Sequence, residues 1–417
     1  MNWNLIAGIK KIVTAETGTK IYAPGLRTPV AFLYPNHYNL GMSNLGLHIL
    51  YQVLDGMGLA CERFFLPEKK DLPEYRRSKT PLFSLETQRA LNIFPYVCVM
   101  MSFEMDYENL LVMLDLGRLP LRSSARSEQD PLVIIGGPCA TFNPEPLAPI
   151  GDIFVIGEGE ETLPRLLHAL ETGKKEHLSR LELLRRAAQV PGVYVPVFYH
   201  PVYSEAAGQG PELTAMEAEK DVPATIRRQW VKRLDDYPHT SAIVTSETEF
   251  RNMYIVEVAR GCGRHCRFCM AGYCFRKPRN RDLECLLADI KRRPDVTAKV
   301  GLMGAAVSDY PQMKELTRAL LVQQIPFSVA SLRADTLDEE LTRALAQSGQ
   351  KTMTVAPEAG SVRMRAAINK GITAEHVYHA MELAAAEGMA NVKLYYMLGL
   401  PGEEAEDAEA MIAMIHK

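Results

Sequence analysis

The feature that most constrains this chain is the spacing of three cysteines, Cys262, Cys266 and Cys269, in a Cys-x3-Cys-x2-Cys motif. An apolar run at 253–258 precedes them, and this pattern predicts a buried β-strand that leads into a loop carrying the cysteines. The chain has 8 cysteines in 417 residues, and five of them lie between 262 and 285. They are too few and too unevenly placed for a disulfide scaffold, so their clustering predicts metal chemistry.

Three thiolates on one loop can bind three irons of a [4Fe–4S] cubane and leave the fourth iron with an open position. An open iron can chelate the amino and carboxylate groups of S-adenosylmethionine (SAM), and an electron from the cluster can then cleave the sulfonium to a carbon radical. Zinc is one alternative, with Cys274 or His265 as a fourth ligand, although well-separated cysteine pairs are the more usual zinc arrangement. Buried, unligated cysteines are the other alternative. We expect Cys274 and Cys285, which lie outside the motif, to pack in this way.

The first part of the chain, residues 1–175, alternates short apolar runs with turn residues and helical patterns. Short buried strands that alternate with helices predict a Rossmann-like, doubly wound parallel sheet. The regularity fades over 176–249, which we interpret as a linker with small β elements.

From residue 250 to residue 417 the β-α rhythm resumes and predicts a parallel α/β barrel. The fifth helical pattern runs to the end of the sequence, so we expect the last repeat of a six-repeat barrel to be absent. The strands are expected at Met253–Val258, Lys299–Met303, Pro326–Ala330, Thr352–Ala356 and Asn391–Met397.

Composition narrows the possible partners. The formal net charge is −3, which indicates no overall basic surface for nucleic acid. Neither the first twenty residues nor any later stretch is long and apolar enough for a signal peptide or a membrane span, so we expect a cytoplasmic protein without a membrane partner. Basic residues near the cysteines could indicate tRNA as a substrate, but we interpret them as a solvated loop whose charges offset an anionic cluster. These are Arg260, Arg264, Arg267, Arg276, Lys277, Arg279 and Arg281.

The motif Cys-x3-Cys-x-aromatic-Cys, with Phe268 as the aromatic residue, resembles the signature of radical SAM enzymes. The resemblance implies a partial (β/α)6 barrel with a [4Fe–4S] cluster in the loop after its first strand, and SAM as a second cofactor. It also implies a one-electron donor such as flavodoxin or ferredoxin.

The same resemblance places SAM contacts in the loops after the later strands. In the segment 304–310 the family usually has a Gly-Gly-Glu-like sequence for the SAM amino group; the glutamate is missing here, so backbone carbonyls or Ser308 would serve. A guanidinium suits a carboxylate and a carboxylate suits a ribose diol, so Arg333 and Glu358 are candidates for those roles. Surface ion pairing and helix capping are the alternatives for the same two residues. The predicted SAM contacts are Phe268, Gly304, Ala305, Ser308, Ser331, Arg333, Glu358 and Gly399.

The first region resembles the cobalamin-binding domain that precedes the barrel in one branch of radical SAM proteins. Four segments, 84–86, 136–139, 157–160 and 357–360, together resemble an uncharacterised group of B12-binding-type radical SAM proteins over nearly the whole chain. Cobalamin is therefore a further predicted cofactor, although a turn would also explain the glycines in these segments. The predicted corrin contacts are Ser102, Gly136, Gly137 and Gly157.

The base-off cobalamin motif, Asp-x-His-x-x-Gly, is not preserved in the corresponding turn at 35–41. The aspartate is absent and the glycine is displaced by one position. We therefore expect His37 to be a structural histidine and not a ligand of cobalt.

These observations predict a radical SAM enzyme that cleaves SAM to a 5′-deoxyadenosyl radical, with methyl transfer through cobalamin to a substrate that no motif identifies. The alternative from another class is a non-catalytic iron–sulfur or corrin-binding sensor or electron carrier. Reductive cleavage of SAM distinguishes the two hypotheses.

Overall fold

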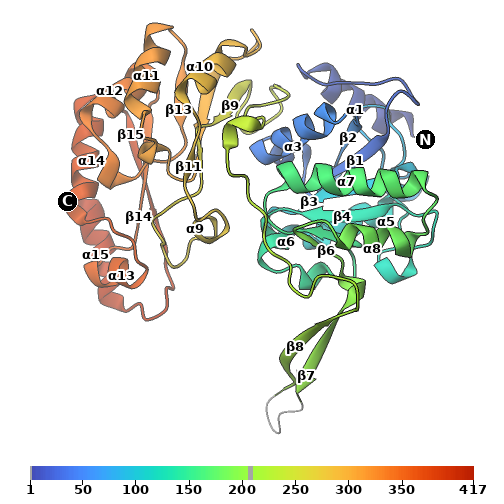
Figure 1. Cartoon of the computed structure of the whole chain (residues 1–417). Coiled ribbons are helices and arrows are strands. Elements are labelled where there is room, and N and C mark those ends of the chain that lie inside the picture. Colours follow the sequence, from blue (N-terminus) through green and yellow to red (C-terminus); the bar gives the residue numbers. More distant parts are fainter. Residues whose placement is uncertain (1, 205–209) are drawn as a thin grey trace. The chain divides into compact units, whose positions relative to one another are not determined.

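The computed structural model describes residues 2–204 and 210–417 (Figure 1). The chain divides into two compact units. The first contains the residues up to 232 together with 245–251, and the second contains 233–244 together with 252–417. Within the described ranges, no helix is both long enough and apolar enough to cross a membrane.

The first unit is built on a six-stranded sheet with the order β2-β1-β3-β4-β5-β6. The strands β1 to β5 run parallel and β6 runs antiparallel to β5, which confirms the predicted doubly wound sheet. The strand order reverses between β1 and β3, and open α/β sheets bind ligands at the carboxyl ends of the strands beside such a reversal. The strands are β1 (Pro29–Tyr34), β2 (Ala60–Phe65), β3 (Tyr96–Met100), β4 (Leu132–Gly136), β5 (Ile153–Val155) and β6 (Val193–Tyr194).

Helices cover this sheet, and its strands are therefore buried along almost their whole length. The longer helix between β1 and β2 is α3 (Leu45–Gly56). It begins after Asn44, whose side chain accepts a hydrogen bond from the backbone N–H of Leu47 and so caps the helix. The helices are α1 (Trp3–Thr14), α2 (Tyr38–Gly41), α3 (Leu45–Gly56), α4 (Leu72–Ser78), α5 (Tyr107–Leu116), α6 (Pro138–Phe142), α7 (Gly159–Lys175) and α8 (Arg180–Ala188).

Much of the segment 176–249 belongs to this first unit. It contributes α8, β6 and the antiparallel hairpin of β7 (Tyr199–Ser204) and β8 (Glu212–Ala218), which extends away from the sheet in Figure 1. A returning segment, residues 226–231, then pairs with the end of the sheet. Its Gln229 N–H donates to the carbonyl of Ile156 over 3.0 Å.

The second unit has five parallel strands, each followed by a helix. Three of them pair in the order β13-β12-β9, and β14 pairs with β15. A parallel bridge between Leu332 and Val355 joins the two groups, so the strands follow one another in chain order, as the barrel prediction requires. The strands are β9 (Met253–Glu257), β12 (Lys299–Met303), β13 (Phe327–Val329), β14 (Thr352–Glu358) and β15 (Asn391–Tyr396), and the helices are α10 (Leu283–Lys291), α11 (Met313–Val322), α12 (Glu339–Gln347), α14 (Ala374–Ala386) and α15 (Ala405–His416).

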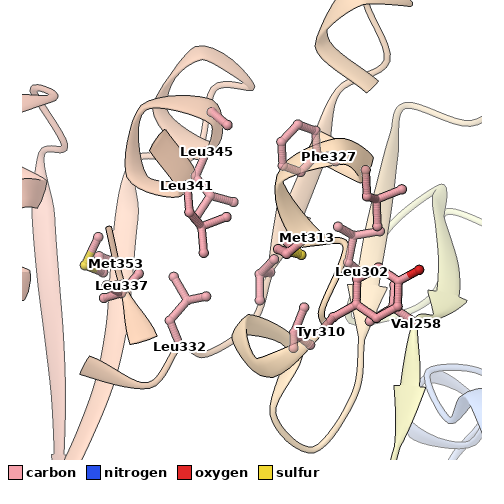
Figure 2. Packing of buried hydrophobic residues seen from close by; sticks show 14 of the residues in the cluster. Val258, Leu302, Tyr310, Met313, Phe327, Leu332, Leu337, Leu341, Leu345 and Met353 are labelled. Atoms are coloured by element: carbon pink, nitrogen blue, oxygen red, sulfur yellow. The ribbon is translucent and has the colours of Figure 1, made fainter. Parts of the chain in front are cut away.

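The core of the second unit lies between these strands and helices (Figure 2). Leu316 and Leu320 on α11 are four residues apart, and so are Leu341 and Leu345 on α12, so each helix buries one apolar face. This packing fixes the strands and hence the loops at their carboxyl ends. The residues labelled in Figure 2 are Val258, Leu302, Tyr310, Met313, Phe327, Leu332, Leu337, Leu341, Leu345 and Met353.

Candidate metal and cofactor site

The cysteine loop, residues 261–278, is closed at its base by an antiparallel ladder between β10 (Ala259–Arg260) and β11 (Arg279–Asn280). Gly261 has a φ of 93°, and a Cβ at this position would lie 2.2 Å from the carbonyl oxygen of Phe275. Only glycine permits this close approach. The ladder holds the loop at the carboxyl end of β9, which is the end where active sites of parallel barrels gather.

A buried ion-pair cluster lies beneath the ladder. Arg281 Nη2 donates to Glu257 Oε2 over 2.7 Å, and Arg260 Nε donates to Glu257 Oε1 over 2.7 Å. Burial raises the pKa of Glu257, but the charges of Arg260 and Arg281 outweigh burial and lower the pKa overall. Arg281 is 1% exposed, so the interpretation of the basic run as a solvated loop is wrong for this residue. The ion pair between Arg281 and the buried carboxylate of Glu257 stabilises the base of the loop.

The far side of the cysteine loop is held by the chain that follows α13 (Val362–Ala367). The backbone N–H of Arg267 donates to the carbonyl of Ile368 over 2.9 Å. The side-chain amide of Asn369 donates to the carbonyl of His265 over 2.9 Å. The loop is thus held both at its base and on its far side.

The three cysteines of the motif differ in burial: Cys266 is buried, and Cys262 and Cys269 are half-buried. Burial raises the pKa of the Cys266 thiol, whereas the positive charges of Lys370 and Arg333 act to lower it. These two cations would offset the charge of bound thiolates.

Arg333, the candidate for the SAM carboxylate, follows β13. Its guanidinium binds Asp335 in bidentate fashion, with Nε to Oδ1 at 3.0 Å and Nη2 to Oδ2 at 2.8 Å. Asp335 Oδ2 also lies 3.5 Å from Arg264 Nη1, and Arg264 binds Asp309 through two hydrogen bonds of 3.0 Å. Burial raises the pKa of Asp335, but the hydrogen bonds from Arg333 and the nearby cations lower it overall. A SAM carboxylate would therefore have to share Arg333 with Asp335.

Glu358, the candidate for the ribose, ends β14 with a φ of 69°. A non-glycine residue in this left-handed region costs on the order of 1–3 kcal/mol, and such residues cluster at functional sites. The Glu358 carboxylate pairs with Lys370 Nζ at 3.3 Å, and that Nζ lies 5.9 Å from the ring centroid of Phe268. Glu358, Lys370 and Phe268 are thus brought together beside the cysteines. Sequence reasoning assigned no role to Asp335, although it follows Arg333 by two positions. The family resemblance placed the segment 369–371, which contains Lys370, among those that flank SAM.

The other predicted SAM contacts also lie at the carboxyl ends of the strands. Ser308 Oγ accepts hydrogen bonds from Thr336 Oγ1 at 2.8 Å and from the Arg333 N–H at 3.4 Å. A Cβ on Gly304 would lie 3.0 Å from the carbonyl oxygen of Ala259, so this glycine lets the loop after β12 approach the base of the cysteine loop. Gly304, Ala305, Ser331 and Gly399 are exposed.

The four predicted corrin contacts follow β3, β4 and β5 in the first unit. Ser102 Oγ accepts a hydrogen bond from Asn44 Nδ2 at 3.5 Å, and Gly136 ends β4. Gly137 has a φ of 102°, and a Cβ there would lie 2.5 Å from the carbonyl oxygen of Met101, so the loops after β3 and β4 touch. A Cβ on Gly157 would lie 2.0 Å from the carbonyl oxygen of Gln229, because the returning segment fills the space at this glycine.

His37, which the sequence predicts to be structural, lies at the start of α2. Its Nδ1 is 3.3 Å from the carbonyl oxygen of Leu66 and 3.7 Å from Glu68 Oε1. The ring is thus engaged by the chain that follows β2.

A buried charge cluster in the first unit was missed at the sequence level. Arg63 on β2 binds Glu16 through Nη2 at 2.7 Å and Glu86 through Nε at 2.6 Å, and its side chain is fully buried. Burial raises the pKa of Glu86, although the charge of Arg63 opposes the rise. The segment 84–86, which contributed to the family resemblance, therefore has a structural role. Two adjacent charged residues, Glu62 and Arg63, inside a short strand that is otherwise apolar were the available signal.

Two family comparisons cover most of the chain. Residues 46–196 match the family described as "Radical SAM proteins, N-terminal", and residues 256–415 match the "Radical SAM superfamily". The family implies a [4Fe–4S] cluster and SAM as cofactors.

Two curated relatives are similar in sequence. The uncharacterized protein MJ0966 of Methanocaldococcus jannaschii is 30% identical over 394 residues, which cover 93% of this chain and 73% of that protein. The uncharacterized methyltransferase PH0819 of Pyrococcus horikoshii is 24% identical over 300 residues, which cover 68% of this chain and 58% of that protein.

Two solved structures share the fold. The radical SAM methyltransferase TsrM of Kitasatospora setae aligns with a TM-score of 0.57 at 15% identity, over 93% of this chain and 71% of TsrM. The cobalamin-dependent SAM radical enzyme OxsB aligns with a TM-score of 0.56 at 15% identity, over 94% of this chain and 52% of OxsB. At these identities the structures show a common fold. Together with the family matches in both units and the 30% identical relative, they lead to one conclusion: the chain belongs to the radical SAM superfamily.

Proposed function

We propose that the chain is a cobalamin-dependent radical SAM methyltransferase. In this proposal Cys262, Cys266 and Cys269 hold a [4Fe–4S] cluster, and reductive cleavage of SAM to a 5′-deoxyadenosyl radical activates a carbon of the substrate. The observation that carries the proposal is the combination of two ligand-binding edges in one chain: a preformed cysteine loop at the carboxyl end of β9, and a parallel sheet whose strand order reverses between β1 and β3.

The donor set of the second unit fits a cluster with a charged cosubstrate. When bound, the cluster supplies an electron to the SAM sulfonium. The residues of the chain bind and orient: the cysteines provide thiolates, and Lys370 and Arg333 provide positive charge close to Cys266. Arg333 has a bidentate guanidinium geometry that suits a carboxylate, and Glu358, which pairs with Lys370, offers an acceptor for hydroxyl groups. In this proposal SAM is bound by Arg333 and Glu358, and ion pairs with neighbouring residues hold both side chains in place.

The carboxyl edge of the first unit fits a flat, largely apolar ligand. Exposed large apolar side chains follow three of its strands, and exposed apolar patches mark binding surfaces. We call these residues the apolar rim. The rim is formed by Leu40 after β1, Phe103 and Met105 after β3, and Phe142 after β4, which are between 42% and 74% exposed.

TsrM and OxsB give independent support. TsrM is described as a radical SAM methyltransferase and has been solved with cobalamin and a [4Fe–4S] cluster bound, and OxsB as a cobalamin-dependent enzyme with cobalamin and SAM bound. PH0819 is described as a methyltransferase. Because the Asp-x-His-x-x-Gly motif is not preserved at 35–41, we further propose that the corrin binds without a histidine ligand from the protein.

The test is anaerobic reconstitution with iron and sulfide, reduction, and measurement of 5′-deoxyadenosine formed from SAM. We expect the iron content of one [4Fe–4S] cluster per chain, the EPR signal of the reduced cluster, and SAM cleavage. Replacement of Cys262, Cys266 and Cys269 together by alanine should abolish all three, and Cys274→Ala is the matched control that should retain them. Stoichiometric zinc without iron after anaerobic purification would contradict the cluster assignment.

A separate measurement tests the corrin. Reconstitution with hydroxocobalamin followed by gel filtration should leave a corrin absorption spectrum on the protein. If no corrin is retained, cobalamin and methyl transfer are removed from the proposal, and the radical SAM assignment stays.

A further inference from the structure

A second group of metal-ligand side chains lies on the helix that follows the cysteine loop. Cys285 and Asp289 on α10 are four residues apart, so they share one face of the helix. His239 faces them from an extended segment that pairs with β9 through the antiparallel bridge between Thr240 and Val256. One nitrogen, one sulfur and one oxygen of these three side chains all lie within 4.8 Å of one another.

The histidine at the centre of this group has an unsatisfied nitrogen. His239 is 2% exposed, and in the described residues its Nε2 has no hydrogen-bond partner, although Asp289 Oδ2 lies 3.3 Å away. Arg292 Nη1 binds the other oxygen of the same carboxylate, Asp289 Oδ1, at 2.8 Å, so this ion pair does not use Oδ2. A buried polar atom without a partner is unfavourable, and a cation between the nitrogen and the carboxylate would satisfy both.

We propose that His239, Cys285 and Asp289 bind a divalent transition-metal ion, and that zinc is the best match. Imidazole, thiolate and carboxylate are the three donor types of protein zinc sites, and three protein ligands leave the fourth tetrahedral position to water. The site is distinct from the cysteine loop and goes beyond the proposed methyltransferase activity. It also gives Cys285 a role that its sequence context did not indicate.

The electrostatics around the site suit a cation. Burial raises the pKa of the Cys285 thiol, and the negative charges of Asp235, Asp289 and Asp282 raise it further, whereas Arg281 opposes them. A metal ion would therefore displace the proton from the thiol and release it to solvent as the sulfur–metal bond forms. The charge of Arg281 is already neutralised in part by Glu257, with which it forms a 2.7 Å ion pair.

The site would fasten the base of the cysteine loop. The chain just before His239 supplies carbonyl oxygens to the buried guanidinium of Arg281, including that of Tyr237 at 3.0 Å. Arg281 in turn follows β11, which closes the loop. A metal that joins His239 to α10 would connect the segment before β9 to the helix that follows the loop.

The experiment uses the full chain with Cys262, Cys266 and Cys269 replaced by alanine, so that the loop thiols cannot bind the probe. Zn²⁺ is titrated and the bound metal is counted after gel filtration. Co²⁺ serves as a spectroscopic probe, because a thiolate ligand produces a charge-transfer band and a tetrahedral site produces intense visible bands. We expect one metal ion per chain with the thiolate band.

Three further substitutions, each added to this background, test the ligands: His239→Gln, Cys285→Ser and Asp289→Asn. Each should weaken the affinity by at least about tenfold, since even outer-shell changes cost roughly 10–100-fold, and Cys285→Ser should remove the thiolate band. The matched control is Glu284→Gln, an exposed carboxylate on the same helix that should leave binding unchanged. Unchanged affinity in both Cys285→Ser and Asp289→Asn, or no metal bound by the background chain, would overturn the proposal.

A second measurement does not depend on the alanine background. The reconstituted wild-type chain should contain zinc in addition to its full iron content, and Cys285→Ser should lose the zinc while the iron measured directly after reconstitution stays the same. Zinc that is lost only together with iron would show that it occupies the cysteine loop, and would overturn the proposal. SAM cleavage is not part of either readout, so the metal site and the proposed function can fail separately.

Discussion

The two units present the same kind of edge, the carboxyl ends of parallel strands, but line it with different side chains. Ion pairs surround the cysteine loop of the second unit. The exposed side chains of the apolar rim follow β1, β3 and β4 in the first unit. The pairs of the second unit are Arg264 with Asp309, Arg333 with Asp335, and Lys370 with Glu358.

This difference indicates two ways of holding a ligand. Paired charges of fixed geometry select charged groups through a few directional contacts, so single substitutions should have large effects. An apolar surface holds a flat ligand through buried area, so the effect of one side chain is limited to the area it contributes. The following predictions test this contrast, from the largest expected effect to the smallest.

The largest effect is expected from the buried ion-pair cluster beneath the cysteine loop. Glu257→Gln removes the charge that faces Arg260 and Arg281, and breaking a buried ion pair costs about 3–5 kcal/mol in free energy of unfolding. Denaturant titration of the full chain measures this loss, and the iron content after reconstitution should fall with it.

The matched control is Glu340→Gln in the same unit, which removes a surface partner of Arg318 and Lys314. An exposed pair contributes only about 0–1 kcal/mol. Equal loss of stability in the two variants would contradict the structural role that we assign to Glu257.

The next effect concerns the ion pairs that face the thiols. Arg333→Ala and Glu358→Ala should each weaken SAM binding by ~1.5–3 kcal/mol, or roughly tenfold to hundredfold, because a charged hydrogen bond to the ligand is lost. The iron content should stay near that of the wild type, since neither residue is a thiolate. Equilibrium binding of SAM to the reconstituted protein, measured beside its iron content, tests this. Wild-type affinity in both variants would place the SAM pocket elsewhere.

A smaller effect is expected at the apolar rim. Phe103 is 54% exposed, and Phe103→Ala should weaken retention of hydroxocobalamin by about 1–2 kcal/mol, or roughly fivefold to thirtyfold, through lost contact area. Ile93, which is 59% exposed and precedes β3 at the opposite edge of the sheet, supplies the control Ile93→Ala. If both variants retain corrin equally well, the rim is not the corrin surface.

The smallest effect is expected at His37. His37→Ala should leave the lower ligand of cobalt unchanged, because the turn at 35–41 lacks the aspartate and the glycine spacing of the base-off motif. The EPR spectrum of bound cob(II)alamin reports this ligand through nitrogen superhyperfine splitting. Splitting that is present in the wild type and absent in the variant would identify His37 as the ligand after all.

Much of the fold was accessible from the sequence because its signals are local. An apolar run in the sequence predicts a β-strand of five or six residues. The spacing of Cys262, Cys266 and Cys269 can likewise be recognised within a single loop. The glycine at 261 could be read as a turn, but the reason for it, the carbonyl of Phe275 across the ladder, could not.

The pairing of charges was not accessible in the same way. The sequence showed Arg281 as one of seven basic residues near the cysteines, and nothing in that run marked it as the buried one. Its partner Glu257 lies across the closed base of the loop, and its carbonyl partners lie more than forty residues away along the chain. The solvated-loop interpretation failed for Arg281 because this residue is buried, and a buried arginine requires a partner of opposite charge beside it.

The sequence by itself determined the class of each unit, the loop that carries the cysteines and the chemistry that three thiolates on one loop can perform. Only the tertiary structure decided that Arg333 pairs with Asp335, that Gln229 fills the space at Gly157, and that His239 lies close to Cys285 and Asp289. The physical reason is the distance along the chain over which each kind of signal acts. Periodicity and spacing act over a few neighbouring residues, whereas a contact between distant residues exists only once the packing of strands and helices has brought their loops together.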